Sequence, residues 1–306
     1  FRKIRKLNPN FIELCLNKKL VPEITLQPVK RFKQLDAAII FSDILMIPYG
    51  LGQKVEFKKN FGPILNEIDI NKISNINEID FTKNLFPVYE SMKIISFDDT
   101  TKNKDIIGFV GAPWTLLVYM LNKKSPKKEI NEKILNNSSL IKNLLNIIDK
   151  FTKLHIKNQI DNGATLIQIF DSWAGLLKDD NQISELIYSP TSTLVDYVKS
   201  LNIPVICFPR GIKNYETYCK MVSPNAINID YEVDPINIQK KIDIPIQGGL
   251  DPKILLSDKD TLKKEALKYL NIFKDHPYIF NLGHGVLPET KPEMVEYLVN
   301  LVKDFK

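Results

Sequence analysis

Polar residues in this sequence stand where its apolar runs end, and their types are those that α/β proteins use for chemistry. The set comprises Asp43, Asp171 with Ser172, Arg210, Asp230, Gln247 with Asp251, and His284. The carboxyl ends of parallel strands meet at one edge of a sheet, and enzymes of this class build their active sites there. We therefore expect these side chains to converge on one site.

Asp43 is the leading candidate. It closes the run AAIIFSD at 37–43, whose small and β-branched side chains predict a strand that is buried on both faces. A lone aspartate shortly before a turn at 48–50 would ordinarily cap that turn. The presence of the other strand-end residues favours a functional role instead.

The sequence supports a functional role for some of the remaining residues more than for others. His284 lies between two glycines, which let the backbone pass close to a ligand, and it is a better candidate than His155 or His276. Asp230 and Asp251 each precede a turn or helix, so we interpret both as caps. Arg210 then has a plain alternative role, which is to pair with one of these carboxylates.

Two common kinds of catalytic site are absent from the sequence. Ser172 lacks the GxSxG context, so nucleophilic serine chemistry is not expected. No HxH, HExxH or Cys/His cluster is present, so we predict no metal site. The three cysteines, Cys15, Cys207 and Cys219, form no CxxC pair, which indicates a reducing compartment without a disulfide framework.

The elements that must position these residues follow a regular rhythm. Helices alternate with seven predicted strands, at 37–41, 106–111, 165–171, 204–208, 226–230, 244–249 and 278–283. Val88, Met92 and Ile95 mark one further helix, and Thr290 with Glu293 has the spacing of a capping box for the last. This rhythm predicts a parallel sheet, either a closed (β/α)8 barrel or a long open sheet. The absence of GxGxxG and GxxxxGK[ST] favours the barrel.

Composition narrows the class of protein. The chain has 306 residues, 44% of them hydrophobic, and shows no linker, repeat or low-complexity spacer, so we expect a single domain over 1–306. Its formal net charge of +6 is spread along the chain. This favours anionic ligands without indicating a nucleic-acid partner. No apolar run approaches the roughly 20 residues of a membrane span, so no membrane association is expected.

Five blocks of the sequence resemble the uroporphyrinogen decarboxylase family. They are FSDIL (41–45), GFVGAPWTL (108–116), IFDSWAG (169–175), QGGLDP (247–252) and FNLGHGVLPET (280–290), and TLQPVKRF (25–32) agrees as well. The resemblance covers essentially the whole chain. It implies a single (β/α)8 TIM barrel that forms a homodimer, works in the cytoplasm and needs no metal or organic cofactor.

The resemblance also implies a reaction and residues for it. The family removes the four acetate carboxyl groups of uroporphyrinogen, a polyanionic porphyrinogen, to give coproporphyrinogen on the path to haem. Asp43 matches the aspartate that accepts pyrrole N–H groups and stabilises positive charge on the ring. Tyr119, Ser172 and His284 match the polar contacts to the substrate, and Phe41 and Ile44 would form apolar walls for the macrocycle.

The chain departs from the family pattern in two places. Gly249 replaces the usual Asn in QGGLDP, a change that we expect the loop to tolerate. The R-Q-A-G-R-Y block of the family, whose arginines hold substrate carboxylates, would lie just before Phe1. Because seven strands are visible, we expect a longer natural protein whose additional N-terminal segment, roughly 30 residues long, supplies the first strand and these arginines.

Two other functions compete with this interpretation. Zinc- and corrinoid-linked methyltransferases share the barrel superfamily, but they carry a His-x-Cys at one strand end, where this chain has Val205 and Cys207. The other is a catalytically inactive relative that binds porphyrinogen. A bound zinc ion would distinguish the methyltransferase from a decarboxylase. Binding of porphyrinogen without turnover would identify the inactive relative.

Overall fold

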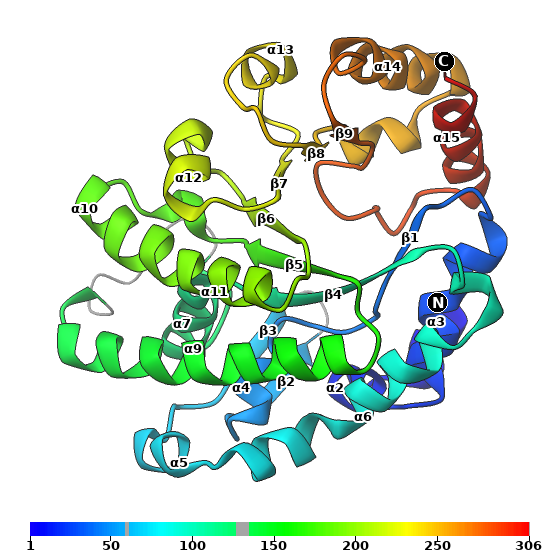
Figure 1. The fold of residues 1–306 in the computed structure, drawn as a ribbon. Helices are drawn as coiled ribbons and strands as arrows, with labels where there is room; N and C mark the ends of the chain where they lie inside the picture. The colour runs from blue at the N-terminus through cyan, green and yellow to red at the C-terminus, as the bar shows by residue number, and fades with distance from the viewer. Residues whose placement is uncertain (59–60, 127–134, 306) are drawn as a thin grey trace.

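Seven parallel strands form the centre of the protein. The computed structural model describes residues 1–58, 61–126 and 135–305. Its sheet has the order β1-β4-β5-β6-β7-β8-β9, so every neighbouring pair is parallel and successive in the chain, with the hairpin β2/β3 set apart (Figure 1). The bounds are β1 Ala37–Ile39, β2 Val55–Lys58, β3 Gly62–Leu65, β4 Asp105–Gly111, β5 Leu166–Asp171, β6 Val205–Pro209, β7 Ala226–Ile229, β8 Ile246–Gly248 and β9 Tyr278–Ile279.

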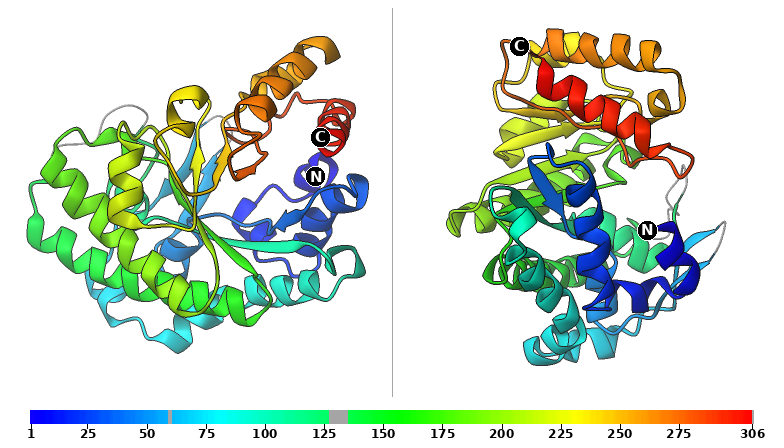
Figure 2. Two further views of the ribbon diagram at one scale, coloured as in Figure 1. Left: turned by 45° about the horizontal axis from the view of Figure 1, so that its top comes forward. Right: turned by 90° about the vertical axis from the view of Figure 1, so that its right-hand side faces the viewer.

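Helices follow the strands and lie around the outside of the curled sheet (Figure 2). The longer ones are α3 Leu20–Arg31, α6 Glu78–Ser96, α7 Pro113–Asn122, α9 Ser138–Asp161, α11 Ser189–Ser200, α12 Tyr215–Val222, α14 Lys259–Ile272 and α15 Pro292–Asp304. The shorter ones are α1 Arg2–Leu7, α2 Phe11–Cys15, α4 Met46–Gly50, α5 Ile70–Asn75, α10 Asp180–Ile183, α13 Pro235–Gln239, the 3₁₀ turns η1 Asp99–Thr101, η2 Ala174–Leu176 and η4 Pro252–Leu256, and the π turn η3 Ser184–Tyr188. Within the described ranges, no helix combines the length and the apolar character needed to cross a bilayer.

Local sequence explains how these helices form. Helix α9 begins after Asn137, whose Oδ1 accepts the Leu140 N–H at 3.1 Å, and it buries Leu144, Ile148 and Phe151 on one face. Helix α7 has Pro113 in its first turn and ends at Lys123, which adopts a left-handed φ of 61°. These helices, like the Val88–Ile95 face of α6, confirm the predicted periodicity.

The concave side of the sheet contains a cluster of buried amides. Gln247 on β8 donates through Nε2 to Asn228 Oδ1 on β7 at 2.6 Å and to Gln168 Oε1 on β5 at 3.4 Å. All three residues are 5% exposed or less. Strands β5 and β8 are not neighbours, so their side chains can meet only inside a strongly curled sheet. Gln247 therefore belongs to the interior rather than to the strand-end site.

The two edges of the sheet are β1 and β9. Residues Ile39 and Ile279 on these strands are each 43% exposed, so the prediction of a first strand buried on both faces was wrong. An edge strand lacks the neighbour that would cover one side. Helix α15 lies beside α3 near these edges, with Arg31–Glu293 at 3.5 Å, Lys303–Asp36 at 3.0 Å and Gln34–Asn300 at 3.0 Å (Figures 1 and 2).

The predicted fold class is confirmed as a curled parallel α/β sheet of seven strands. Its last strand is shorter than expected, because β9 ends at Ile279 and the chain continues as an irregular segment with one bridge from Leu282 to Leu250. The predicted capping box was also wrong. Lys291 is the N-cap of α15, and the Thr290 hydroxyl is buried without a hydrogen-bond partner among the described residues.

Candidate active site

The carboxyl ends of the strands carry the predicted site residues along one rim of the sheet. Asp171 on β5 is in register with Pro209 on β6, so the next residues, Ser172 and Arg210, are neighbours. The Arg210 N–H donates to Asp171 O at 3.1 Å, which fixes this pairing. The backbone pattern therefore brings the polar ends of β5 and β6 together, as predicted.

Asp43 lies in the segment between β1 and α4, four residues beyond the strand end. Its Oδ1 accepts the Leu45 N–H at 2.8 Å, while Oδ2 accepts no hydrogen bond from a described residue. The side chain is partly buried, and this desolvation raises its pKa to about 6, against the effect of the Leu45 bond. At neutral pH the group is a fixed carboxylate with one free oxygen.

Tyr119 on α7 reaches the same region from the next helix. Burial, with a smaller effect of the nearby Asp43 charge, raises its pKa to about 12, although Trp173 and Arg210 act in the opposite direction. The phenol is therefore neutral and able to donate a hydrogen bond. Its ring packs edge-on against Trp173, with centroids 5.8 Å apart.

The loop after β5 is held by buried hydrogen bonds. The Thr115 hydroxyl donates to Asp171 Oδ1 at 2.6 Å and accepts the Trp173 N–H at 3.1 Å. Asp171 is fully buried, which raises its pKa to about 7. Its role is to anchor the loop that presents Ser172 and Trp173, both partly buried.

His284 lies on the exposed segment after β9. Its Nδ1 accepts the Gly285 N–H at 2.7 Å, so the neutral ring carries its proton on Nε2, where it can donate to a ligand. Loss of hydration lowers the pKa of His284, and the Arg210 charge lowers it further, with Asp230 acting in the opposite direction. Gly283 packs against the backbone at Asp230 and Tyr231, where a Cβ would lie 2.4 Å from Tyr231 N.

Phe41 and Ile44 flank Asp43 with apolar surface, and their role as walls for the macrocycle stays a prediction. The Phe41 ring contacts Phe1 and Phe11, with centroid distances of 5.4 and 5.7 Å. Ile44 packs against Gly111 at the end of β4, where a Cβ would lie 3.1 Å from Ile44 Cβ. Both residues are partly buried, so part of each side chain remains available to a ligand.

Arg5 is a residue that sequence reasoning missed. It donates through Nη1 to Asn8 O and Pro9 O, and its guanidinium lies 5.4 Å from the centre of the Phe11 ring. Arg5 and Asp43 act with opposite sign on the pKa of the buried Cys15 thiol, so both charges lie near that thiol. The only sequence signal was an arginine in a basic N-terminal run, a pattern that usually marks a solvated helix face.

The two aspartates interpreted as caps behave differently from each other. Asp251 is the N-cap of η4 and accepts the Lys253 N–H at 2.8 Å, which confirms the prediction. Asp230 accepts the Glu232 N–H at 2.9 Å, so it caps the turn that follows it, and it also accepts the Gly211 N–H at 3.0 Å, which links this turn to the loop after β6. Gly249 adopts a φ of +100°, a conformation that glycine takes without strain.

The described residues offer few groups for metal binding or for thiolate chemistry. Among the described residues, no group of three His, Cys, Asp or Glu side chains is arranged to hold a metal ion. Burial raises the pKa of both the Cys207 and the Cys219 thiol to about 12, so neither is a thiolate at neutral pH. The expectation of a site without metal or cofactor stays a prediction.

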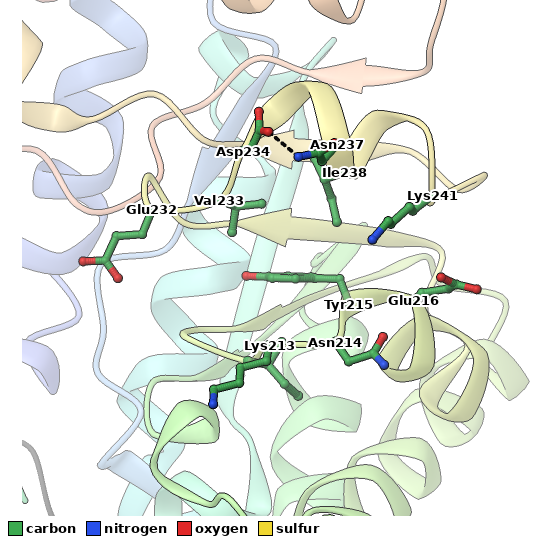
Figure 3. Close-up of a pocket in the computed structure, with 11 residues that line it drawn as sticks. Lys213, Asn214, Tyr215, Glu216, Glu232, Val233, Asp234, Asn237, Ile238 and Lys241 are labelled. Atoms are coloured by element: carbon green, nitrogen blue, oxygen red, sulfur yellow. Dashed lines mark hydrogen bonds between the residues drawn. The ribbon is translucent and has the colours of Figure 1, made fainter.

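A cleft of about 510 Å³ opens farther along the rim, between residues 212–216 and 232–241 (Figure 3). Its lining includes the carboxylates of Glu216, Glu232 and Asp234 against the ammonium groups of Lys213 and Lys241. None of the predicted site residues lines it. A cleft with more carboxylates than cations suits a polyanion less well than the region around Asp43, Tyr119 and Arg210.

Comparison with solved structures bears on the fold alone. A methyltransferase from Methanosarcina mazei superposes with a TM-score of 0.79 over 99% of this chain and 90% of its own, at 16% identity. A putative vitamin-B12 independent methionine synthase from Listeria monocytogenes gives a TM-score of 0.55 over 94% of this chain and 87% of its own, at 14% identity. At such identities the resemblance carries the architecture and no chemistry.

Sequence comparison is more specific. A uroporphyrinogen decarboxylase of Rickettsia bellii (strain RML369-C) is 40% identical over 99% of this chain and 90% of its own length. That of Rickettsia felis (strain ATCC VR-1525 / URRWXCal2) is 38% identical over 99% of this chain and 88% of its own. The model of the uroporphyrinogen decarboxylase (URO-D) family matches residues 1–305. Because the family model covers nearly the whole chain and these relatives are about 40% identical along it, the chain belongs to the uroporphyrinogen decarboxylase family.

Proposed function

We propose that this protein is a carboxy-lyase that converts uroporphyrinogen to coproporphyrinogen in haem biosynthesis. The observation that carries the proposal is the Asp43 carboxylate, fixed by the Leu45 N–H with its second oxygen free, in a chain that matches the family over 1–305. The neighbouring phenol, imidazole and guanidinium groups suit a substrate with many carboxylates.

The reaction needs an electron sink, and the pyrrole ring supplies it. Protonation of a ring carbon produces a cation that is carried largely on the pyrrole nitrogen. The bond from the acetate methylene to its carboxyl group then breaks, its electron pair neutralises the cation, and CO2 leaves. Protonation of the methylene carbon and loss of the added ring proton give the methyl group.

Asp43 stabilises this cation. Its ionised, partly buried carboxylate accepts the pyrrole N–H groups, and its interaction with them strengthens as positive charge develops on the ring. Phe41 and Ile44 provide apolar contact for the macrocycle beside it. These contacts also exclude water, which strengthens the electrostatic interaction.

Tyr119, Ser172 and His284 orient the substrate by donating hydrogen bonds to its carboxylates. The hydroxyl groups of Tyr119 and Ser172 are neutral donors. The neutral imidazole of His284 donates through Nε2, and protonation makes it a stronger donor. Each substrate presents four acetates in turn, so the protein must release or rotate the macrocycle between steps. Residues that only orient carboxylates therefore affect every re-docking.

We further propose that the protein is a cytoplasmic homodimer that works without metal or organic cofactor. The scattered, unpaired cysteines support a reducing compartment, and the family resemblance supports the dimer. Light scattering on the purified protein tests the dimer, and metal analysis tests the zinc-dependent alternative, which a stoichiometric zinc ion would favour.

Asp43→Asn tests the proposed reaction. The variant retains an oxygen for the Leu45 N–H and loses the charge, so decarboxylation should fall by roughly 10²–10³-fold while the circular dichroism spectrum is unchanged. Asp99→Asn is the matched control, because Asp99 is exposed and lies before the N-terminal end of β4, whereas the site lies at the C-terminal ends of the strands. A near-normal rate for all four steps in the Asp43 variant would contradict the assignment.

A further inference from the structure

The rim holds a guanidinium group that forms no ion pair with a described residue. Arg210 is partly buried at the end of β6, and it forms no salt bridge with a described residue. By contrast, Arg31 is paired with Glu293 at 3.5 Å on the surface. A partly desolvated cation without a counter-ion is suited to receive an anionic ligand.

The Asp230 carboxylate, one of the two pairing partners that the sequence suggested for Arg210, accepts hydrogen bonds from backbone groups. Asp230 uses Oδ2 for the Gly211 N–H at 3.0 Å and Oδ1 for the Glu232 N–H at 2.9 Å. Its hydrogen bonds therefore shape the loop that carries Arg210. The pairing of Arg210 with Asp230 or Asp251 that the sequence left open is not found among the described residues.

The Arg210 backbone is held on both sides. Its N–H donates to Asp171 O at 3.1 Å, and its carbonyl accepts the Gly175 N–H at 3.0 Å. A Cβ on Gly175 would lie 2.5 Å from Gly211 O, so the two loops pack as closely as glycine permits. An arginine on such a fixed backbone is pre-organised, because less motion is lost when it binds.

The position of the guanidinium follows from its neighbours. Its charge acts on both Tyr119 and His284, lowering the pKa of each, so it lies within electrostatic range of two residues that we assign to the substrate. Ser172 is its neighbour across the β5–β6 register. Arg210 therefore lies on the same part of the rim as three residues that we assign to substrate carboxylates, Tyr119, Ser172 and His284.

We propose that Arg210 is a substrate-binding residue that holds, through paired N–H donors, a porphyrinogen carboxylate other than the one being lost. This inference rests on the proposed function, since it needs a polycarboxylate ligand at this rim. The planar guanidinium matches a carboxylate in a way that a lysine ammonium does not. Arg210 thus fixes the orientation of the macrocycle over Asp43.

The test combines binding and turnover in the full-length natural protein. Uroporphyrin, the oxidised macrocycle that keeps the eight carboxylates and does not react, serves as the binding probe by fluorescence. Arg210→Gln should raise its Kd by roughly ten- to a hundredfold, the usual effect of losing one charge-assisted contact. The KM for uroporphyrinogen should rise similarly with kcat changed less than about threefold, and Arg210→Lys should recover part of the loss.

Arg31→Gln is the matched control, because it removes the same charge from an exposed site. It should leave Kd, KM and kcat unchanged. The sequence has three histidines, so proton NMR can follow His284 directly. Arg210→Gln should raise the pKa of His284 and Arg31→Gln should not, which tests whether the Arg210 charge lies near His284. A rise in KM and Kd with kcat nearly unchanged, partly recovered in Arg210→Lys, is the response that a purely structural role of Arg210 would not produce.

The possible outcomes separate this inference from the proposed function. An active wild type with unchanged KM and Kd in folded Arg210→Gln would overturn the role of Arg210. An inactive wild type that binds uroporphyrin more tightly than Arg210→Gln would reject the decarboxylase and keep the carboxylate site. If Arg210→Gln fails to fold, Arg210→Lys decides: wild-type Kd and KM in that variant would reject the paired-donor contact.

Discussion

At Asp43, the burial that makes the carboxylate effective toward a cationic intermediate also makes its charge unfavourable in the free protein. The folded-state pKa of about 6 lies above the ordinary 3.8, so the folded protein binds this proton more tightly than the unfolded chain does. The resulting loss of stability is absent near pH 4 and fully present above about pH 6. Function and stability therefore make opposite demands on this residue.

Asp43→Asn should accordingly stabilise the protein at pH 7 while it lowers the rate of decarboxylation. The pKa shift sets an upper limit of about 3 kcal/mol on the gain in the free energy of unfolding, and partial exposure of the side chain reduces it. Urea denaturation at pH 4 and pH 7 measures the effect. A gain of equal size at both pH values would indicate a cause other than the buried charge.

His284 and Tyr119 should give partial defects when changed. If both orient carboxylates, His284→Asn and Tyr119→Phe should slow turnover and let partly decarboxylated intermediates accumulate, because each step requires the macrocycle to dock again. Chromatography of the products measures this distribution. Complete loss of the first decarboxylation in either variant would instead assign that residue a direct chemical role.

At the scale of the elements, the buried amides link β5, β7 and β8. Gln247→Leu removes a donor to Asn228 and leaves a buried amide oxygen unpaired, so we expect a loss of about 1–3 kcal/mol in the free energy of unfolding. Gln239→Leu, at the partly exposed end of α13, is the control and should change stability by less than about 0.5 kcal/mol. If Gln239→Leu lost as much free energy of unfolding as Gln247→Leu, the unpaired buried amide would not be the cause of the loss.

The sequence was informative about elements because parallel strands buried between helices read as short apolar runs. It revealed all seven strands of the sheet and most of the long helices. It missed the β2/β3 hairpin, because Val55–Lys58 is short and its partner begins with Gly-Pro, and it overextended β9 into an irregular segment. These features depend on pairing partners rather than on local pattern.

The site was predictable only as far as local patterns and the family resemblance reached. Asp43 and His284 were found because one follows an apolar run and the other lies between glycines. Arg5 was missed because its relation to Asp43 depends on how Cys15 and Phe11 pack. The free charge of Arg210 could not be read from sequence either, since it follows from the backbone hydrogen bonds that occupy Asp230.

For the whole molecule, the position of α15 depends more on apolar burial than on the two ion pairs that join it to the segment 31–36. The ion pairs Arg31–Glu293 and Lys303–Asp36 join side chains that are 51 to 87% exposed, and such pairs contribute little. The double variant Arg31→Gln/Lys303→Gln should lose less than about 1 kcal/mol in the free energy of unfolding, even at low salt.

Leu298→Ala provides the comparison, because Leu298 is 7% exposed and its truncation should remove about 2–4 kcal/mol from the free energy of unfolding. Denaturant titration of both variants measures the difference. A larger loss in the double charge variant than in Leu298→Ala would reverse this view of how α15 is held.

The buried amides also bear on how the chain avoids misfolding. An interior lined by hydrocarbon alone would tolerate a strand that pairs one residue out of step, since one apolar side chain replaces another. Here a shifted β7 or β8 would turn Asn228 or Gln247 away from its partner and leave unpaired amides in the buried interior. Slipped pairings of β7 and β8 are therefore disfavoured, so the buried amides specify the register of these strands in addition to stabilising them.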